Sequence, residues 1–345
     1  MGVDFGLFDW IDQGTVPLHQ LYEERLQLLE AADTAGFFCY HLAEHHGTAL
    51  GLAPSPSLFL AAAAQRTRQI RLGPLTYVLP LYDPVRLADD IAMLDNLSIG
   101  RLELGVGRGA SPHEVRYFGI DVSRSRAMYE EAMSVLIAAM TSDRINFKGE
   151  HYQYEDVPVE VHPLQRPYPP LWYPTSSLES IPYAARHGFN FAGLGPAAHV
   201  RRQVDKYREV WNEHRNDPNR LNAHVRSPRL GIMRLIVVAE TDAEGLQLAR
   251  GAHDRWYRSI TKLWHENNDH SMDARFSWES AAQNETVLCG SPSRVREQMT
   301  RLIETSACNY VLCVFAWGGL PHQQALKSLR LFVDEVMPAF SAPLR

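Results

Sequence analysis

The chain has 345 residues, of which 45% are hydrophobic, and its formal net charge is −6 at pH 7. This length fits one large domain, because α/β barrels commonly run to about 250 residues or more as a single domain. The mildly acidic balance, without a run of Lys or Arg, argues against a nucleic-acid-binding protein.

Strand-like and helical patterns alternate along the chain. The short apolar or β-branched runs cover residues 3–8, 37–42, 70–79, 101–106, 170–174, 189–194, 232–239 and 309–315. Helical patterns cover residues 18–35, 57–66, 84–100, 123–139, 179–187, 199–214, 242–261, 293–305 and 322–337. Repeated β-then-α units predict a parallel sheet that closes on itself. We therefore expect an α/β fold, a (β/α)8 TIM barrel, as a single domain over residues 1–345.

Two segments interrupt this alternation. Residues 145–161 alternate polar and apolar side chains around Gly149, which predicts an inserted hairpin. Residues 267–285 are polar and hold few aliphatic side chains. A long insertion of this kind in a compact domain is usually a lid or a mobile loop, and we expect one of these here.

Compartment signals are few. The N-terminus lacks the basic and apolar stretches of a signal peptide, and no apolar run approaches the roughly 20 residues of a membrane span. The four cysteines are scattered, which argues against a disulfide framework. We therefore expect a cytoplasmic protein without a membrane segment.

A cluster of titratable residues follows the second predicted strand. Glu44, His45 and His46 come directly after residues 37–42. Chemistry in a barrel takes place at the carboxyl ends of the strands, so one of these histidines is a candidate general acid or base, oriented by its neighbours. The alternative is a pair of surface histidines in a loop.

A zinc site overlaps this cluster. His41, Glu44 and His45 have the H-x-x-E-H spacing of a class of zinc peptidases. That motif needs a helix, so that residues four apart share one face and bind one ion. Because aromatic, strand-like residues precede the motif, a zinc hydrolase is the weaker interpretation.

Glycines and an arginine follow the fourth predicted strand. In Gly105-Val106-Gly107-Arg108-Gly109, backbone N–H groups can approach an anion closely, and Arg108 adds charged donors. The position and spacing do not fit a Rossmann dinucleotide site, which requires G-x-G-x-x-G at the first βα turn. A phosphate site and a tight turn with a surface arginine both fit this segment.

Hydroxyl groups follow the fifth predicted strand, where a helix opens. Ser176 and Ser177 can donate to a phosphate together with free N–H groups of the helix, or can simply cap that helix. Arg126 lies at the start of the helix after the fourth strand, where it can bind a phosphate or face solvent. Two arginines and a serine cluster on adjacent barrel loops suit one terminal phosphate.

Aromatic side chains also lie at predicted strand ends. These are Trp10, Trp172, Tyr173 and Trp317. Each can flank a planar ligand or can serve only in packing.

These motifs, in this order, resemble the bacterial-luciferase-like flavin-dependent monooxygenase family. The resemblance covers nearly the whole chain and is most specific in the first 130 residues. The matching segments are Ala43 to His46, Pro54 to Ser57, Arg66 to Gly73, Leu79 to Ala88, Leu94 to Leu102, Gly105 to Gly109, Gly290 to Pro292 and Gly318 to His322.

The resemblance implies FMN at the mouth of a TIM barrel. The family's catalytic histidine corresponds to His45, with Glu44 and His46 as neighbours. Its phosphate-binding positions correspond to Arg108, Arg126, Ser176, Ser177 and Ser180.

Three further positions follow from the resemblance. A cis peptide bond that is not followed by proline, located beneath the flavin, corresponds to Leu75-Thr76. An acidic side chain under the ring system corresponds to Glu114. Gly107 replaces the reactive cysteine of luciferase, which argues against light emission and is expected to leave more room above the ring.

The implied activity is that of an FMN-dependent monooxygenase. Reduced FMN comes from a separate flavin reductase, O2 adds at flavin C4a to give a peroxyflavin, and His45 manages protons. The substrate is expected to be a small apolar organic molecule, and the protein a homodimer. A deazaflavin-dependent oxidoreductase on the same fold and a non-catalytic flavin-binding protein also fit this resemblance.

Overall fold

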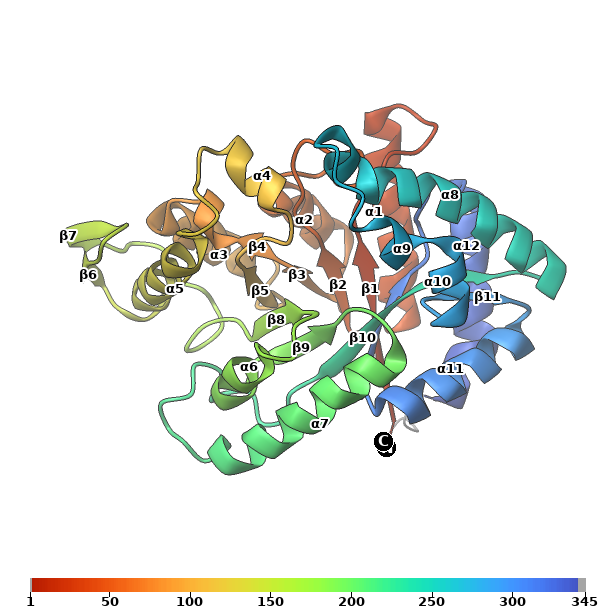
Figure 1. Ribbon diagram of the computed structural model, residues 1–345. Helices are drawn as coiled ribbons and strands as arrows, with labels where there is room; N and C mark the ends of the chain where they lie inside the picture. The colour runs from red at the N-terminus through yellow and green to blue at the C-terminus, as the bar shows by residue number, and fades with distance from the viewer. Residues whose placement is uncertain (1, 341–345) are drawn as a thin grey trace.

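Parallel strands form the centre of the protein, and helices surround them (Figure 1). The computed structural model describes residues 2–340, so residue 1 and residues 341–345 of the predicted domain lie outside the described residues. The strands of the main sheet are β1 (Asp4–Asp9), β2 (Cys39–Leu42), β3 (Arg71–Pro74), β4 (Tyr77–Val78), β5 (Leu104–Gly107), β8 (Leu171–Thr175), β9 (Asn190–Gly193), β10 (Leu230–Val238), β11 (Val287–Gly290) and β12 (Tyr310–Val314).

The sheet closes into a barrel, as predicted. Its strand order is β3-β2-β1-β12-β10-β9-β8-β5-β4, and all of these neighbours pair in parallel. A parallel bridge joins Leu72 of β3 to Leu102, which lies just before β5, and so closes the circle. The structure therefore confirms the α/β barrel.

Strand β11 was not predicted from the sequence. It pairs with the second half of β10, where Leu235 lies opposite Val287, while the first half of β10 pairs with β12. Leu235 also pairs with Val314 of β12, so β11 and β12 lie on opposite sides of β10.

The helices agree closely with the sequence prediction. They are α1 (Leu18–Ala35), α2 (Pro56–Arg66), α3 (Pro84–Leu97), α4 (Pro112–Tyr117), α5 (Ser125–Thr141), α6 (Ile181–His187), α7 (Ala197–His214), α8 (Asp242–Glu266), α11 (Pro292–Ser306) and α12 (His322–Leu331). Short helix α4 was not predicted. The last predicted helix changes to a π turn at Phe332–Val336 and a 3-10 turn at Met337–Ala339. No helix among residues 2–340 is long and apolar enough to cross a membrane.

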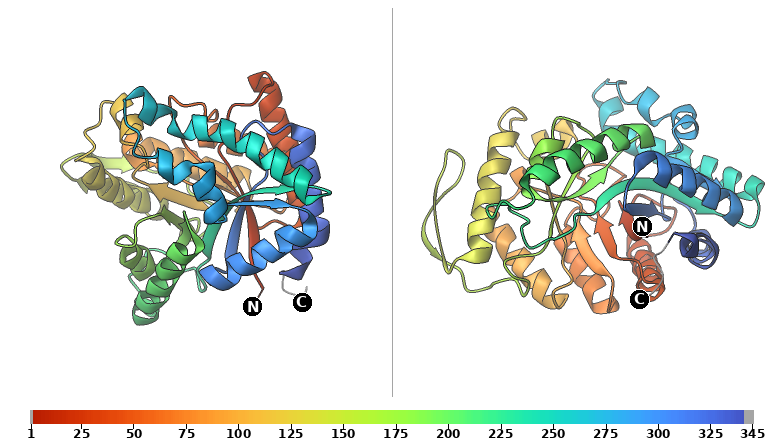
Figure 2. Two further views of the ribbon diagram at one scale, coloured as in Figure 1. Left: turned by 45° about the vertical axis from the view of Figure 1, so that its right-hand side comes forward. Right: turned by 90° about the horizontal axis from the view of Figure 1, so that it is seen from below.

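The two segments outside the alternation have defined structure. Strands β6 (Arg144–Lys148) and β7 (Gln153–Pro158) form an antiparallel hairpin that projects from the side of the barrel (Figure 1). Residues 267–285 contain two short helices, α9 (Asp273–Phe276) and α10 (Trp278–Gln283), which lie against α8 in both views of Figure 2.

Alternation along the strands separates two apolar layers. On β1, Phe5 and Leu7 pack outward against the helices, while Phe8 belongs to the cluster that fills the barrel. On β12, Tyr310 and Leu312 likewise point inward. This pattern follows from the two-residue period of a strand, which sends successive side chains to opposite faces.

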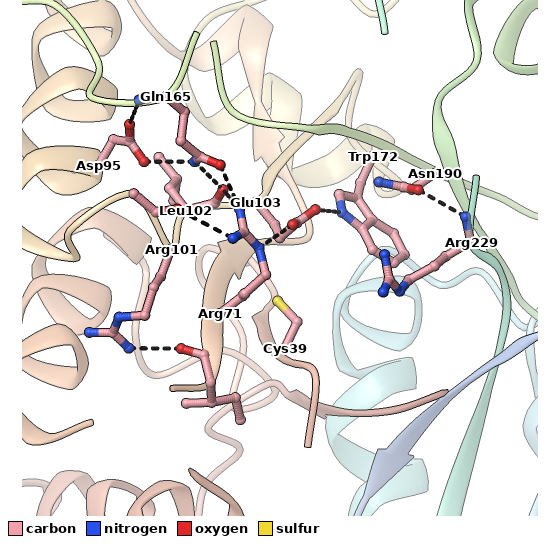
Figure 3. Close-up of polar contacts among 12 residues, drawn as sticks. Cys39, Arg71, Asp95, Arg101, Leu102, Glu103, Gln165, Trp172, Asn190 and Arg229 are labelled. Atoms are coloured by element: carbon pink, nitrogen blue, oxygen red, sulfur yellow. Dashed lines mark hydrogen bonds and ion pairs between the residues drawn. The ribbon is translucent and has the colours of Figure 1, made fainter. Parts of the chain in front are cut away.

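A polar cluster fills the amino-terminal end of the barrel (Figure 3). The buried Glu103 carboxylate accepts hydrogen bonds from the Arg71 guanidinium and from Nε1 of Trp172. Arg71 also donates to Gln165 over 2.7 Å. Burial raises the pKa of Glu103, while Arg71 opposes that shift. We interpret this paired cluster as structural, since the chemistry of a barrel takes place at the other end.

Candidate active site

His45 is held at the carboxyl end of the barrel by a carboxylate from another loop. Its Nδ1 lies 3.0 Å from Oε1 of Glu114, which is in the first turn of α4. The other carboxylate oxygen, Oε2, accepts the backbone N–H of His46 over 2.8 Å. Because the Glu114 side chain is only 9% exposed, it is a fixed support for the loop after β2. Among residues 2–340, no group bonds Nε2 of His45.

Gly51 completes the support of His45. A Cβ added at Gly51 would lie 2.5 Å from Cβ of His45 and 3.2 Å from its Cα. Only a glycine lets the chain pass this close to the histidine, so the position of His45 depends on both Glu114 and Gly51.

Glu44 is buried, and its carboxylate accepts hydrogen bonds from other groups of the protein. It accepts from His46 Nε2 over 2.9 Å, from the backbone N–H of Val78 over 2.9 Å, and from the Tyr82 hydroxyl. Burial raises the pKa of Glu44, while the bond from His46 opposes the shift. Glu44 therefore ties the histidine loop to β4 and orients His46.

The zinc interpretation of this cluster is wrong. His41 points into the barrel, where its Nε2 lies 2.9 Å from the Tyr310 hydroxyl and its ring packs edge-on against Trp172. Burial lowers the pKa of His41 to about 3, so the ring stays neutral. In the described part of the chain, His41, Glu44 and His45 do not bring ligand atoms together around one point. The reason is the strand context, which sends His41 to the barrel interior.

One small pocket joins the histidine loop to the loop after β5. Its walls come from the ends of β2, β4 and β5 and from α4, and it is lined by Glu44, His45, Val78, Leu81, Gly109, Ala110, Ser111, Glu114 and Val115. Two predicted site segments that are about 60 residues apart in sequence therefore meet at this pocket.

The peptide bond between Leu75 and Thr76 is cis, as the resemblance implies. Strand β5 passes very close to this segment. A Cβ at Gly105 would lie 2.2 Å from the Pro74 carbonyl oxygen, and a Cβ at Gly107 would lie 2.7 Å from Oγ1 of Thr76. The Thr76 side chain therefore takes up the space next to the Gly107 backbone. These two glycines make room for the protein's own chain.

The predicted phosphate-binding arginines lie on exposed loops and turns. Arg108 is exposed directly after β5, and Gly109 has a positive φ of 96° that favours glycine. Arg126 is in the first turn of α5, where it pairs with Glu130 over 3.1 Å. Its charge acts on Tyr183 of α6, so the start of α5 lies near α6.

The predicted serines lie between β8 and α6. Ser177 Oγ donates to Glu179 over 3.0 Å, and the carbonyl of Ser176 accepts from His199 over 2.8 Å. Ser180 precedes α6 and makes no side-chain capping bond. Because β5 and β8 are parallel neighbours, these serines and Arg108 follow strand ends at the same edge of the barrel. Among residues 2–340, no bond joins the serines to either arginine.

The aromatic residues at the strand ends serve mainly in packing, one of the two roles expected for them. Trp172 and Trp317 are fully buried, and Tyr173 contacts Tyr129 of α5 and Tyr183 of α6. Trp10 lies near the mouth and packs against Trp256 of α8, with ring centroids 5.9 Å apart. Trp10, Trp172 and Trp317 are therefore packing residues, whereas Tyr173 stays partly exposed.

Sequence reasoning missed Trp256 and the contact between Glu114 and His45. A local signal for α4 was present, since Ser111 and Glu114 have the S-x-x-E spacing of a helix start, and Ser111 accepts from the Glu114 N–H. That signal predicts a helix but does not identify the partner of the Glu114 carboxylate.

Comparisons with known proteins agree with this geometry. A family model described as luciferase-like monooxygenase matches residues 3–308. The protein y4wF of Sinorhizobium fredii is 38% identical over 337 residues, covering 96% of both chains. The oxygenase component of the flavin-dependent trigonelline monooxygenase of Acinetobacter baylyi is 28% identical, covering 93% of this chain and 91% of that one.

Solved structures share the fold. The oxygenating constituent of 3,6-diketocamphane monooxygenase from Pseudomonas putida, a type II Baeyer–Villiger monooxygenase in complex with FMN, aligns over both full chains with a TM-score of 0.81 and 23% identity. An F₄₂₀-dependent secondary alcohol dehydrogenase aligns over 99% of this chain and 100% of that one, with a TM-score of 0.74 and 18% identity. The chain thus belongs to the luciferase-like monooxygenase family and is a flavin-dependent monooxygenase by type, as its motifs predict.

Proposed function

We propose that this protein uses reduced FMN and O2 to oxygenate a small apolar organic substrate. The observation that carries the proposal is His45, which Glu114 holds at a pocket shared with the loop after β5. The relative from Acinetobacter baylyi is named as an oxygenase component, which supports a separate flavin reductase as the source of reduced FMN.

The phosphate of FMN fits the donors at the edge formed by β5 and β8. Arg108 and Arg126 supply charged donors, and Ser176, Ser177 and Ser180 supply hydroxyl and backbone donors near the start of α6. Arg126 exchanges an exposed partner, Glu130, for the phosphate at little cost, because exposed ion pairs contribute about 1 kcal/mol or less.

The ring system of FMN fits beside the cis peptide. Leu75, Thr76 and Gly107 line the approach between β3, β4 and β5, and His45 lies on the neighbouring loop. When bound, FMN supplies the electrons that activate O2. The protein contributes position, charge and the exclusion of water.

His45 is the proposed acid and base. Glu114 occupies Nδ1, which fixes the ring and leaves Nε2 to exchange a proton with a ligand. Glu44 and His46 act through position, since Glu44 orients His46 and both tie the loop to β4.

The apolar mouth favours an apolar substrate. Trp10 and Trp256 pack together as a buried aromatic surface, and the partly exposed Phe276 covers it, with the Trp256 and Phe276 centroids 5.6 Å apart. Phe276 belongs to the segment 267–285, which we propose as the lid that closes this surface to water. Phe276 packs on Trp256 of α8, so opening the lid would expose the Phe276 ring.

The second candidate is a deazaflavin-dependent oxidoreductase. The structural similarity to the F₄₂₀-dependent alcohol dehydrogenase favours it, because the same fold holds that coenzyme there. Such an enzyme would transfer a hydride and would not need O2.

An anaerobic titration followed by oxygenation tests the proposal. The protein is titrated with reduced FMN and, separately, with reduced deazaflavin, and the FMN complex is then mixed with ¹⁸O2 and a panel of apolar ketones, terpenes and N-heterocycles. We expect preferential binding of reduced FMN and a product that contains one ¹⁸O atom. Preferential deazaflavin binding, with no ¹⁸O in any product, would contradict the proposal.

A further inference from the structure

A second group of histidines lies at the junction of α8 and the segment 267–285, apart from the His45 loop. Nε2 of His265, at the end of α8, lies 2.6 Å from Oδ1 of Asp273 in α9. Nδ1 of His270 lies 2.9 Å from Oδ2 of the same carboxylate. The two imidazole rings lie 4.8 Å apart at an interplanar angle of 34°.

The three donor atoms are arranged as metal ligands are. Each residue offers one possible ligand atom, and these atoms lie within 4.8 Å of one another. Ligand atoms around a tetrahedral Zn²⁺ lie about 2.0–2.2 Å from the ion, so a movement of about 1 Å by exposed side chains would close the set. All three residues are partly or largely exposed, which leaves a remaining position open to water.

We propose that His265, His270 and Asp273 bind a divalent first-row transition-metal ion such as Zn²⁺. Two imidazole nitrogens select such an ion over Mg²⁺ and Ca²⁺, which prefer oxygen ligands. This site does not rest on the proposed flavin chemistry, because it uses none of the same residues.

The charge state of the group suits a cation. The carboxylate of Asp273 supplies an acidic ligand to the set and accepts hydrogen bonds from both imidazoles. Tyr257 also donates to this carboxylate. Binding uses neutral imidazoles, with the proton of each ring on its other nitrogen, so affinity falls in acid.

Occupancy would join the end of α8 to α9. The end of α8 in turn contacts the histidine loop, since Lys262 Nζ donates to the Gly47 carbonyl over 3.3 Å and Thr48 Oγ1 donates to the Ser259 carbonyl over 3.1 Å. Trp264 packs edge-on against His113, the neighbour of Glu114 in α4. A metal ion here would therefore restrain the segment 267–285 and the helix that supports the mouth.

Calorimetric titration of metal-free protein with Zn²⁺ tests the site. The variants His270→Gln and Asp273→Asn remove one ligand each, and His19→Gln, which removes an exposed histidine on α1, is the matched control. We expect each ligand variant to bind Zn²⁺ about 100-fold more weakly, the share of one ligand in a protein zinc site, while the control binds like the parent protein.

Tryptic cleavage after the exposed Arg275 of α9 supplies a local readout. We expect Zn²⁺ to slow this cleavage in the parent protein and in His19→Gln, and EDTA to restore it. The same Zn²⁺ should have no effect on the cleavage of Asp273→Asn. Equal zinc affinity in the parent and both ligand variants would place the ion elsewhere, for example at His45 and His46, and would overturn the proposal. Failure of the parent protein to bind Zn²⁺ would do the same.

Discussion

Nδ1 of His45 and Oε1 of Glu114 lie 3.0 Å apart, although 69 positions separate the two residues in the sequence. The contact joins the loop after β2 to the first turn of α4. A carboxylate at Nδ1 fixes the tautomer and the direction of the ring and leaves Nε2 available. The carboxylate of Glu114 therefore supports the histidine, a role that the resemblance alone does not indicate.

Replacing Glu114 with Gln should impair turnover more than cofactor binding. The amide retains a hydrogen bond to the ring but loses the carboxylate charge beside it, so we expect kcat to fall by roughly 10-fold or more. The Kd of reduced FMN should change little. Steady-state kinetics and an anaerobic FMN titration measure both quantities.

Glu150→Gln is the matched control, because Glu150 lies exposed on the hairpin and forms only a long ion pair with Arg124. Its kinetics should equal those of the parent protein. An unchanged kcat in Glu114→Gln would show that the contact with His45 has no part in the reaction.

Replacing Gly105 with Ala should destabilise the fold. The new methyl group would meet the Pro74 carbonyl oxygen at 2.2 Å, and because this is backbone, the strand has to move. We expect a loss of about 1–3 kcal/mol in the free energy of unfolding, as overpacking typically causes. Urea denaturation followed by circular dichroism measures it.

Gly251→Ala supplies the comparison. Gly251 lies inside α8 with nothing within 4 Å of an added Cβ, so alanine should stabilise the protein by about 0.5–1 kcal/mol. Equal effects of the two substitutions would contradict the close approach of β5 to residues 74–76.

The barrel and the candidate site differ in how well the sequence predicts them. Helix α1 was predicted with both bounds correct, because its apolar stripe and the αL cap at Gly36 are local signals. Strand β11 was missed because it has only four residues and forms by pairing with the second half of β10, a contact that a local pattern does not indicate. Contacts between distant loops, such as that of His45 with Glu114, depend on how the helices pack on the strands, and a local sequence pattern does not predict them.

The glycines within β5 illustrate the same limit. Their spacing correctly indicated that something approaches the backbone closely, but the sequence does not say what. At Gly107 the approaching group is the side chain of Thr76. The inward direction of Trp172 was not predicted for a related reason, since it depends on the strand register.

His41 should make the protein less stable in mild acid. Burial lowers the pKa of His41 to about 3 in the folded protein, whereas the value in a model peptide is 6.5. Below pH 6.5 the His41 side chain is therefore protonated in the unfolded chain but stays neutral in the folded protein. Stability from this group is therefore present above pH 6.5 and is lost as the pH falls towards 3, by about 2 kcal/mol between pH 8 and pH 5.

The variant His41→Gln removes this titration while keeping a group that can bond to Tyr310. Its free energy of unfolding should fall by about 2 kcal/mol less than that of the parent protein over the same pH change. Urea denaturation at pH 8, 6.5 and 5 gives the two slopes, and identical slopes would show that His41 is not buried in a neutral state.

Replacing Glu103 with Gln should destabilise the base of the barrel. The change leaves the largely buried Arg71 without its counter-charge, and breaking one partner of a buried pair costs about 3–5 kcal/mol. Asp156→Asn breaks the exposed pair with Arg144 on the hairpin and should cost about 1 kcal/mol or less. Thermal unfolding of both variants compares them, and a Glu103→Gln protein as stable as the parent would contradict the buried pair.

The most direct measurement of the central claim compares His45→Ala with His46→Gln in single turnovers with reduced FMN and ¹⁸O2. Both variants should bind reduced FMN with a Kd close to that of the parent protein. We expect His45→Ala to lower the rate of ¹⁸O incorporation by about 10²–10⁴-fold, and His46→Gln to lower it far less, because only His45 presents a free Nε2. Undiminished ¹⁸O incorporation by His45→Ala would contradict the account.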